Sequence, residues 1–215
     1  MEKLDESVNI FTKDGWQIVE KEFNEEQKIN NGSNFLLGNG YLGNRANFCD
    51  DKKDDYVACI VTDTFDKADG KWRELCNVPN GLFTEFKVNG KKITNSETGF
   101  LNYEKSLDFE KGLLSIKREF KNGLEVKSQR FTSIKDKNLI AMKLELKAKK
   151  DISLDLKSGI DGDVWSLNGN HFESQDTYSD NDLLISYCKT KEWQTDIYVV
   201  EFQNYSIKDK NEDIY

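Results

Sequence analysis

The sequence predicts an all-β protein, an antiparallel β-sandwich with few or no helices. Apolar and charged residues alternate with a period of two, strand-like segments follow one another at regular spacing, and Gly and Asn turns separate them. A strand that buries one face and exposes the other belongs to an antiparallel sheet, because parallel strands are usually covered on both faces. The 215 residues contain no linker or internal repeat, so we expect residues 1–215 to form one sandwich domain.

The predicted strands run along most of the chain. In order, they cover residues 16–22, 56–63, 82–88, 100–107, a hairpin over 113–131, then 141–149, 152–157, 172–178, 183–187 and 197–202. The alternation is clearest over 141–149, where Met142, Leu144 and Leu146 share one face and lysines and a glutamate share the other. Further turns are expected at 88–91 and 168–170, which contain Asn-Gly pairs.

The hydrophobic pattern selects the loop of the hairpin over 113–131. A two-residue turn would pair Phe120 with Glu125, which places an apolar residue opposite a charged one. A three-residue loop over 121–123, with its glycine in the left-handed conformation, pairs Phe120 with Leu124 instead. We therefore predict the longer loop, which also implies two further pairs: Arg118 with Val126 and Ile116 with Ser128.

This hairpin places two arginines on its apolar face. Arg118 and Arg130 cannot be buried there without partners, so we expect carboxylates such as Asp108, Asp155 or Asp161 to approach them. A structural ion pair between strands or sheets is one interpretation. A guanidinium that faces a ligand is the other.

Composition and charge exclude several classes of protein. The 39 acidic side chains outnumber the 31 basic ones, for a formal net charge of −8, so there is no basic surface for nucleic acid and no polybasic membrane patch. No segment approaches the ~20 apolar residues of a membrane span. The first ten residues lack the pattern of a signal peptide. We therefore expect neither a nucleic acid partner nor a membrane, and a cytoplasmic protein.

The four cysteines predict reduced thiols that are mostly buried. Cys49, Cys59, Cys76 and Cys188 form no C-x-x-C pair, and the single His171 completes no zinc-binding spacing. We therefore expect no metal site. A cytoplasmic location also favours free thiols over disulfides.

The segment GNGYLG at residues 38–43 satisfies the dinucleotide-binding pattern G-x-G-x-x-G, and Asp63 follows about 20 residues later. That fingerprint binds pyrophosphate only where a strand leads into a helix. The following residues, 44–51, are poor helix formers, and the chain contains no second βαβ unit. We expect no dinucleotide or ATP site here.

In full, the segment LGNGYLGNRAN at residues 37–47 resembles the N-terminal signature of glycoside hydrolase family 65. Further segments resemble this family's pattern in the same order: WQI at 16–18, ELCNVPN at 74–80, LDF at 107–109 with Gly112, Leu114 and Arg118, RFTS at 130–133, and SGIDG at 158–162. The sequence departs from the pattern at Ala46, where glycine is usual, and at Cys49-Asp50, where an acidic pair is commoner.

The resemblance implies the N-terminal domain of an enzyme that acts on α-glucosides. The family contains inverting phosphorylases for maltose, trehalose, kojibiose and nigerose, and related hydrolases. Its N-terminal domain resembles the supersandwich of galactose mutarotase, and a larger (α/α)₆ barrel follows and carries the general acid and the phosphate-binding residues. The chain would then be an N-terminal fragment with no catalytic residue of its own. The resemblance further implies no cofactor, inorganic phosphate as co-substrate of a phosphorylase, and a homodimer.

Four residues are candidates for contact with substrate: Asn39, Tyr41, Arg45 and Trp72. The loop over 38–47 could pack against the barrel and help to shape its cleft, or it could only form a tight turn. Arg45 could instead pair with one of the aspartates at 50 and 51.

Exposed aromatic residues offer a second route to sugar binding. Trp72, Trp165 or Trp193 could provide a flat platform for a pyranose ring, although tryptophan is more often buried. His171 lies beside a predicted turn, and we expect a surface or turn residue rather than a general acid. The alternative to an enzyme domain is a free-standing carbohydrate-binding or interaction module.

Overall fold

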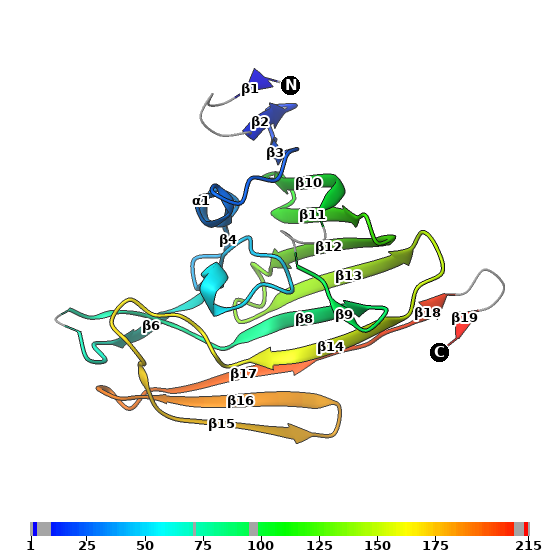
Figure 1. Ribbon diagram of the computed structural model, residues 1–215. Helices are drawn as coiled ribbons and strands as arrows, with labels where there is room; N and C mark the ends of the chain where they lie inside the picture. Colours follow the sequence, from blue (N-terminus) through cyan, green and yellow to red (C-terminus); the bar gives the residue numbers. More distant parts are fainter. Residues whose placement is uncertain (1, 4–9, 71, 95–98, 209–212, 215) are drawn as a thin grey trace.

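The computed structural model describes residues 2–3, 10–70, 72–94, 99–208 and 213–214, and these are almost entirely β structure (Figure 1). The strands form five sheets, and every pairing is antiparallel. The predicted antiparallel β-sandwich is confirmed. Most of the first ten residues, and most of the charged segment over 208–215, lie outside the described residues.

The large sheet has seven strands in the order β1-β2-β3-β10-β11-β12-β13. Its strands are β1 (Glu2–Lys3), β2 (Ile10–Lys13), β3 (Gln17–Glu20), β10 (Phe100–Asp108), β11 (Leu113–Phe120), β12 (Leu124–Thr132) and β13 (Ile140–Ala148). From β10 to β13 the sheet is a meander in which each strand pairs with the next.

Three smaller sheets complete the sandwich, and a short ribbon lies near the C-terminus. The four-stranded sheet contains β4 (Leu37–Gly38), β5 (Leu42–Asn44), β6 (Cys59–Asp66) and β7 (Glu74–Asn77). The middle sheet is β14 (Leu154–Asp161), β8 (Asn80–Val88) and β9 (Lys91–Lys92), and the outer sheet is β15 (Phe172–Asp180), β16 (Leu183–Thr190) and β17 (Asp196–Phe202). The ribbon pairs β18 (Ile207–Lys208) with β19 (Asp213–Ile214).

Helical structure in the described residues is limited to α1 (Lys28–Asn34) and one 3₁₀ turn (Lys53–Asp55). The sequence of α1, KINNGSN, contains poor helix formers, and no side chain caps its N-terminus. Contacts with other segments hold it instead, because the buried Asn31 donates to Glu20 of β3 and the Ala46 N–H donates to the Gly32 carbonyl at 2.8 Å. No described helix is long and apolar enough to cross a membrane.

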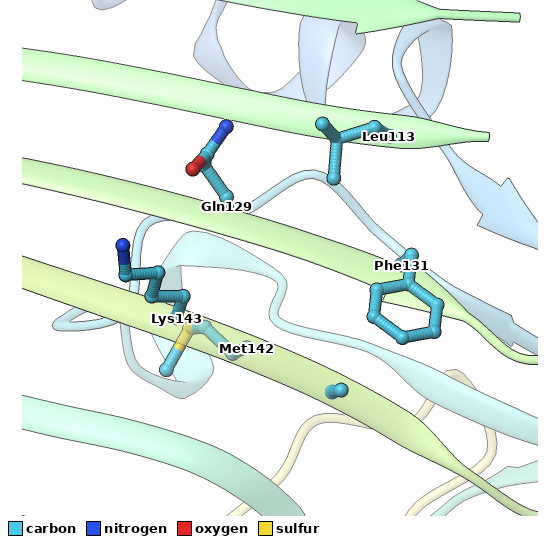
Figure 2. A pocket seen from close by; sticks show the side chains of 6 residues that line it. Leu113, Gln129, Phe131, Met142 and Lys143 are labelled. Atoms are coloured by element: carbon cyan, nitrogen blue, oxygen red, sulfur yellow. The ribbon is translucent and has the colours of Figure 1, made fainter. Parts of the chain in front are cut away.

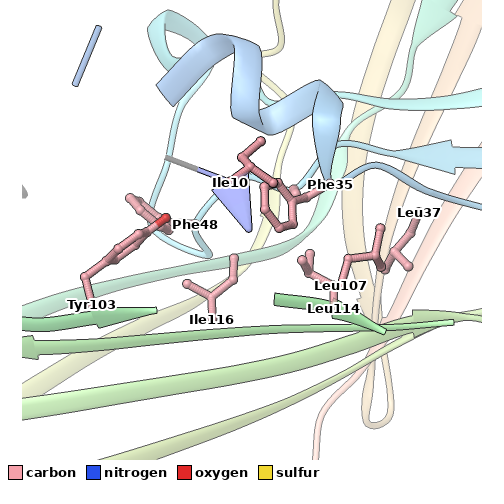
Figure 3. Packing of buried hydrophobic residues seen from close by; sticks show 9 residues of the cluster. Ile10, Phe35, Leu37, Phe48, Tyr103, Leu107, Leu114 and Ile116 are labelled. Atoms are coloured by element: carbon pink, nitrogen blue, oxygen red, sulfur yellow. The ribbon is translucent and has the colours of Figure 1, made fainter. Parts of the chain in front are cut away.

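Three clusters of buried side chains hold the layers together. The first lies where α1 and the segments around β4 cover the large sheet, and Figure 3 shows Phe35, Leu37 and Phe48 above Leu107 and Ile116. The second joins the large sheet to the middle sheet through Phe86, Phe120 and Leu124, among others. The third joins the four-stranded sheet to the outer sheet through Cys76, Phe172, Cys188 and Ile197. The four-stranded and middle sheets therefore lie between the large and outer sheets.

The predicted register of the β11–β12 hairpin is confirmed. Arg118 pairs with Val126 and Ile116 pairs with Ser128. Gly123 has a positive φ of 97°, and its N–H donates to the Phe120 carbonyl at 3.0 Å, as a three-residue loop requires. The turn at 88–91 is a two-residue hairpin turn with positive φ at both central residues, as expected for Asn-Gly.

Candidate functional site

The signature segment over 37–47 forms the β4–β5 hairpin rather than a strand followed by a helix. Strand β5 ends at Asn44, and residues 45–50 form no helix, so no helix N-terminus faces the loop. This geometry agrees with the expectation that GNGYLG is not a dinucleotide-binding loop.

Asn39, a candidate for substrate contact, uses its side chain in hydrogen bonds within the chain. Its Oδ1 accepts hydrogen bonds from the N–H groups of Tyr41 at 3.0 Å and Leu42 at 2.9 Å. Its Nδ2 donates to the carbonyls of Ser133 at 2.7 Å and Lys137 at 2.9 Å. The side chain therefore ties the β4–β5 hairpin to the loop between β12 and β13, which lies more than 90 residues away in sequence.

Tyr41, the second candidate, is half-buried, and its carbonyl accepts the Thr62 N–H at 2.8 Å. Beside this hairpin the surface is apolar. Leu36 is 48% exposed and Ile60 is 37% exposed, and both lie close to Gly43, which has no side chain to separate them. We call Leu36, Gly43 and Ile60 the hairpin patch.

Arg45, the third candidate, binds backbone carbonyls rather than the neighbouring aspartates. Its guanidinium donates to the carbonyl of Tyr56 at 3.2 Å and to that of Ile29, so it joins α1 to the chain after the 3₁₀ turn. Burial lowers the pKa of this guanidinium.

At Ala46, where the family usually has glycine, the methyl group is buried in the first core cluster. The fold accommodates this departure without strain.

The partners predicted for Arg118 are wrong, although the ion pair itself is present. Arg118 donates to Asp50 at 2.6 Å, and the side chains are only 2% and 8% exposed. Burial opposes the charged form of Arg118, but the attraction of Asp50, together with smaller contributions from Cys49 and Asp51, raises the pKa of the guanidinium. Asp108 instead accepts hydrogen bonds from Gln17 and Lys111 near the end of the large sheet.

For Arg130 the predicted carboxylate is also wrong. The guanidinium donates to Asn44 Oδ1 at 3.1 Å and to the carbonyls of Arg45 and Asn47. Burial lowers the pKa of Arg130. Both arginines lie beneath the segment over 44–50, so they hold the signature segment against the large sheet rather than facing a ligand.

A second buried charge pair was not predicted. Lys105 and Glu20 lie 3.6 Å apart, and both side chains are almost fully buried. Glu20 also accepts hydrogen bonds from Tyr103 and Asn31, each at 2.6 Å. Burial lowers the pKa of Lys105 and raises that of Tyr103. A signal was present in the sequence, because Lys105 alternates with Tyr103 and Leu107 on the apolar face of its strand.

A third charge pair anchors α1. Lys28 lies 2.9 Å from Asp51 and 2.5 Å from Asp55. Burial raises the pKa of Asp51 to about 6, with smaller contributions from Asp50 and Asp55, while Lys28 opposes the shift. The Phe48 ring stands at the centre of these pairs, with Arg118 at 4.3 Å, Lys105 at 5.3 Å and Lys28 at 5.6 Å from its centroid.

His171 was expected as a surface or turn residue; it follows a bend of the chain, but the surface position is wrong. The ring is 1% exposed, with Nδ1 3.3 Å from Asp66 and Nε2 2.7 Å from Glu74. The chain bends at residues 167–169, and the His171 ring lies in the junction between the four-stranded and outer sheets. The backbone pattern gave no sign of this, because both carboxylates lie about 100 residues earlier in the chain.

The four cysteines are unpaired thiols. Burial raises the pKa of Cys49 and Cys76 to about 12 and that of Cys59 and Cys188 to about 11. These thiols are therefore protonated at neutral pH and are poor nucleophiles. Within the described residues, no group of three or more His, Cys, Asp or Glu side chains has the arrangement of a metal site.

The predicted aromatic residues separate into two groups. Trp72, the fourth candidate, is 57% exposed, and Trp193 is 53% exposed. Trp165 is partly buried against Tyr56, with ring centroids 5.1 Å apart. The structure therefore leaves Trp72 and Trp193 free to contact a ligand and uses Trp165 in packing.

A shallow hollow of about 300 Å³ opens on the large sheet between β11, β12 and β13 (Figure 2). Leu113, Phe131 and Met142 contribute most of its apolar lining, and Lys143 is its one charged side chain. Hydrolysis or phosphorolysis of a glycoside with inversion needs a carboxylic acid at the leaving oxygen. This hollow contains none, whereas the buried carboxylates Glu20 and Asp51 are held by hydrogen bonds within the fold.

The fold and these inward-facing charges define an antiparallel β-sandwich domain whose buried ion pairs hold its layers together. The structure of a putative kojibiose phosphorylase from the human microbiome superposes with a TM-score of 0.78 at 15% identity, over 93% of this chain and 28% of that one. This likeness shows a shared fold.

The chain belongs to glycosyl hydrolase family 65, and the family model of its N-terminal domain matches residues 18–213. A 1,2-α-glucosylglycerol phosphorylase from Bacillus selenitireducens is 39% identical over 90% of this chain and 26% of its own length. A nigerose phosphorylase from Lachnoclostridium phytofermentans is 31% identical over 74% of this chain and 21% of its own length. The chain thus spans about a quarter of the length of these relatives.

Proposed function

We propose that this chain is the N-terminal domain of an inverting α-glucoside phosphorylase or hydrolase, and that it supports catalysis without performing it. The observation that carries the proposal is the 39% identity to a phosphorylase of which the chain spans only 26%. The remainder would carry the (α/α)₆ barrel with the general acid and the site for phosphate as co-substrate. No cofactor is needed for this chemistry.

The hairpin patch agrees with a domain that packs against the catalytic barrel. The nearby polar side chains of Asn39 and Arg45 form hydrogen bonds within the chain. Leu36 and Ile60 remain exposed. A surface that is apolar and rigid is suited to packing against another domain. We propose that the barrel docks here, so that the β4–β5 hairpin borders the entrance to its active site.

A homodimer and a cytoplasmic location belong to the same proposal. Four unpaired thiols agree with a reducing compartment. Exposed apolar side chains occur on several sheets, and side chains of this kind suit a contact with the barrel or between subunits.

The test is release of glucose 1-phosphate or glucose from 1,2-α-glucosylglycerol, kojibiose, nigerose, maltose and trehalose in phosphate buffer. We expect activity from the protein expressed from its complete reading frame and none from the 215-residue chain. Phosphate-dependent turnover by the chain alone would contradict the non-catalytic assignment. Turnover by neither protein would contradict the enzyme assignment and favour a carbohydrate-binding module.

The docking surface has its own variant. Ile60→Asp places a charge on the hairpin patch, and we expect it to lower the activity of the complete protein at least tenfold while leaving the isolated chain folded. Leu101→Asp is the control, because Leu101 is 64% exposed on β10. Equal effects of the two variants would remove the hairpin patch as the docking surface.

A further inference from the structure

Two tryptophans at neighbouring hairpin tips remain exposed. Trp72 lies just before β7, and Trp193 lies in the turn between β16 and β17, with 57% and 53% of their surfaces exposed. Both tips lie at the same end of the molecule, on the left in Figure 1. An indole is a large apolar group, so two of them exposed together indicate a binding surface.

Arg73 connects the two tips. Its guanidinium donates to both carboxylate oxygens of Glu192, at 2.9 and 2.5 Å. The same guanidinium lies 5.2 Å from the centroid of the Trp193 ring. Such a bidentate pair fixes the orientation of the arginine, and the stacked guanidinium limits rotation of the indole.

The buried cluster around His171 fixes the backbone of both tips from below. Asp66, which faces His171, accepts the N–H of Glu192 at 2.7 Å and that of Ala68 at 2.6 Å. Glu74, which faces the other ring nitrogen, accepts the N–H of Asn168 at 3.0 Å. Asn168 in turn donates its side-chain amide to the Trp72 carbonyl at 2.7 Å. The cluster therefore supports Trp72 and Trp193 at once.

This support makes the surface rigid before any ligand arrives. Its framework is buried, since Asp66 is 0% and His171 1% exposed, so the tips cannot shift without breaking interior contacts. A site that is ordered in advance loses less conformational entropy on binding. The buried His171 thus has a structural role, which is to hold the two hairpin tips in place.

The surrounding groups indicate the chemistry of the ligand. Arg73 and Glu192 border the rings, and Lys191 and Asp69 lie 3.8 Å apart beside them, with Asp69 82% exposed. The core of a protein–protein contact is depleted of such charges. A pyranose ring suits both features, because its C–H face packs on an aromatic ring and its hydroxyls pair with charged donors and acceptors.

We propose that Trp72, Arg73, Glu192 and Trp193 form a binding site for an α-glucoside. The choice of an α-linked sugar rests on the proposed function, whereas the site itself rests on the exposed rings and their buried support. The Trp193 face not covered by Arg73 would receive the sugar ring, and the carboxylate and guanidinium would receive its hydroxyls.

The experiment is an NMR titration of the 215-residue chain with maltose and with kojibiose. The chain has four tryptophans and therefore four indole N–H signals. We expect the signals of Trp72 and Trp193 to shift with a dissociation constant in the millimolar range, and that of Trp16 to stay. Trp16 is the matched control, because it is 58% exposed but lies in the turn between β2 and β3. Sorbitol, which has hydroxyls but no ring, should shift none of the four.

Variants complete the test. Trp193→Ala and Trp72→Ala should each weaken binding at least tenfold, and Trp16→Ala should leave it unchanged. No shift at Trp72 and Trp193, or equal shifts at all exposed indoles, would overturn the proposal. Binding that survives Trp193→Ala would overturn it as well. Sugar binding by a complete protein that lacks both phosphorolysis and hydrolysis would instead contradict only the proposed function, so the two failures are distinguishable.

Discussion

At the scale of single residues, the chain concentrates its charge inside the fold around one aromatic ring. Phe48 lies near three cations, and each cation has its own carboxylate: Arg118 with Asp50, Lys105 with Glu20, and Lys28 with Asp51. Buried charges are tolerated only when they are paired and hydrogen-bonded. Removal of one partner therefore leaves the other charge buried with its desolvation cost uncompensated.

Asp50→Asn is the direct test of this arrangement. We expect it to lower the free energy of unfolding by about 3–5 kcal/mol, because Arg118 would remain charged and buried without its carboxylate. Urea denaturation followed by circular dichroism measures the loss. The control is Glu145→Gln on the exposed Lys143–Glu145 pair, with an expected effect under ~1 kcal/mol. Similar losses in the two variants would contradict a special contribution from the buried pair.

Asp51 provides a prediction for pH. Burial raises its pKa from 3.8 to about 6, so the folded chain binds this proton more tightly than the unfolded chain does. The corresponding stability is fully present below about pH 4, the ordinary range of an aspartate, and is lost as the pH rises to about 6. In Asp51→Asn this loss is absent. The difference in unfolding free energy, native minus variant, should therefore fall between these pH values, and a constant difference would refute the shift.

At the scale of elements, hairpins follow local rules and the helix does not. The loops of β8–β9 and β11–β12 were predictable because turn chemistry and the period-two pattern specify the same register. The sequence of α1 predicts no helix, and none was expected over 28–34. Its stability comes from Lys28 and Asn31, which reach Asp51 and Glu20 in other segments.

Gly123→Ala tests the hairpin loop. The φ of 97° is unfavourable for any residue with a Cβ, so we expect the variant to lose about 1 kcal/mol or more of unfolding free energy. Gly38→Ala is the control, because Gly38 does not have a positive φ and its nearest neighbour to an added Cβ is the Leu42 carbonyl oxygen at 3.4 Å. Thermal unfolding compares the two. If alanine were tolerated equally at both positions, the left-handed loop would not be needed.

At the scale of the whole molecule, His171 connects sheets that are distant in sequence. Its ring lies between Asp66 and Glu74 of the four-stranded sheet, while its own segment leads into β15 of the outer sheet. This junction supports both the third core cluster and the tryptophan surface, so its loss affects more than one layer.

His171→Ala should accordingly destabilise the chain by about 2–4 kcal/mol, through the cavity it creates and the buried Asp66 it leaves without the ring. The midpoint of urea denaturation is the measurement, with the slope unchanged if unfolding stays two-state. Ser174→Ala, on the exposed face of β15, should change the stability by less than ~0.5 kcal/mol. An effect of His171→Ala as small as that of Ser174→Ala would show that the junction does not depend on the histidine.

The sequence by itself determined the all-β class, most of the strands and the register of the central hairpin. These depend on alternation and turn residues within a few positions of one another, so a local pattern contains them. The resemblance of the signature segments also identified the family, which the comparisons confirmed.

Only the tertiary structure decided which groups meet. Arg118 finds Asp50 across 68 positions, Arg130 finds the Asn47 carbonyl across 83, and His171 finds Asp66 across 105. The alternation showed that two arginines must be buried, but the many acidic residues of the chain gave no basis for choosing among partners. Electrostatic pairing depends on distance in space, and distance is set only once the sheets have packed.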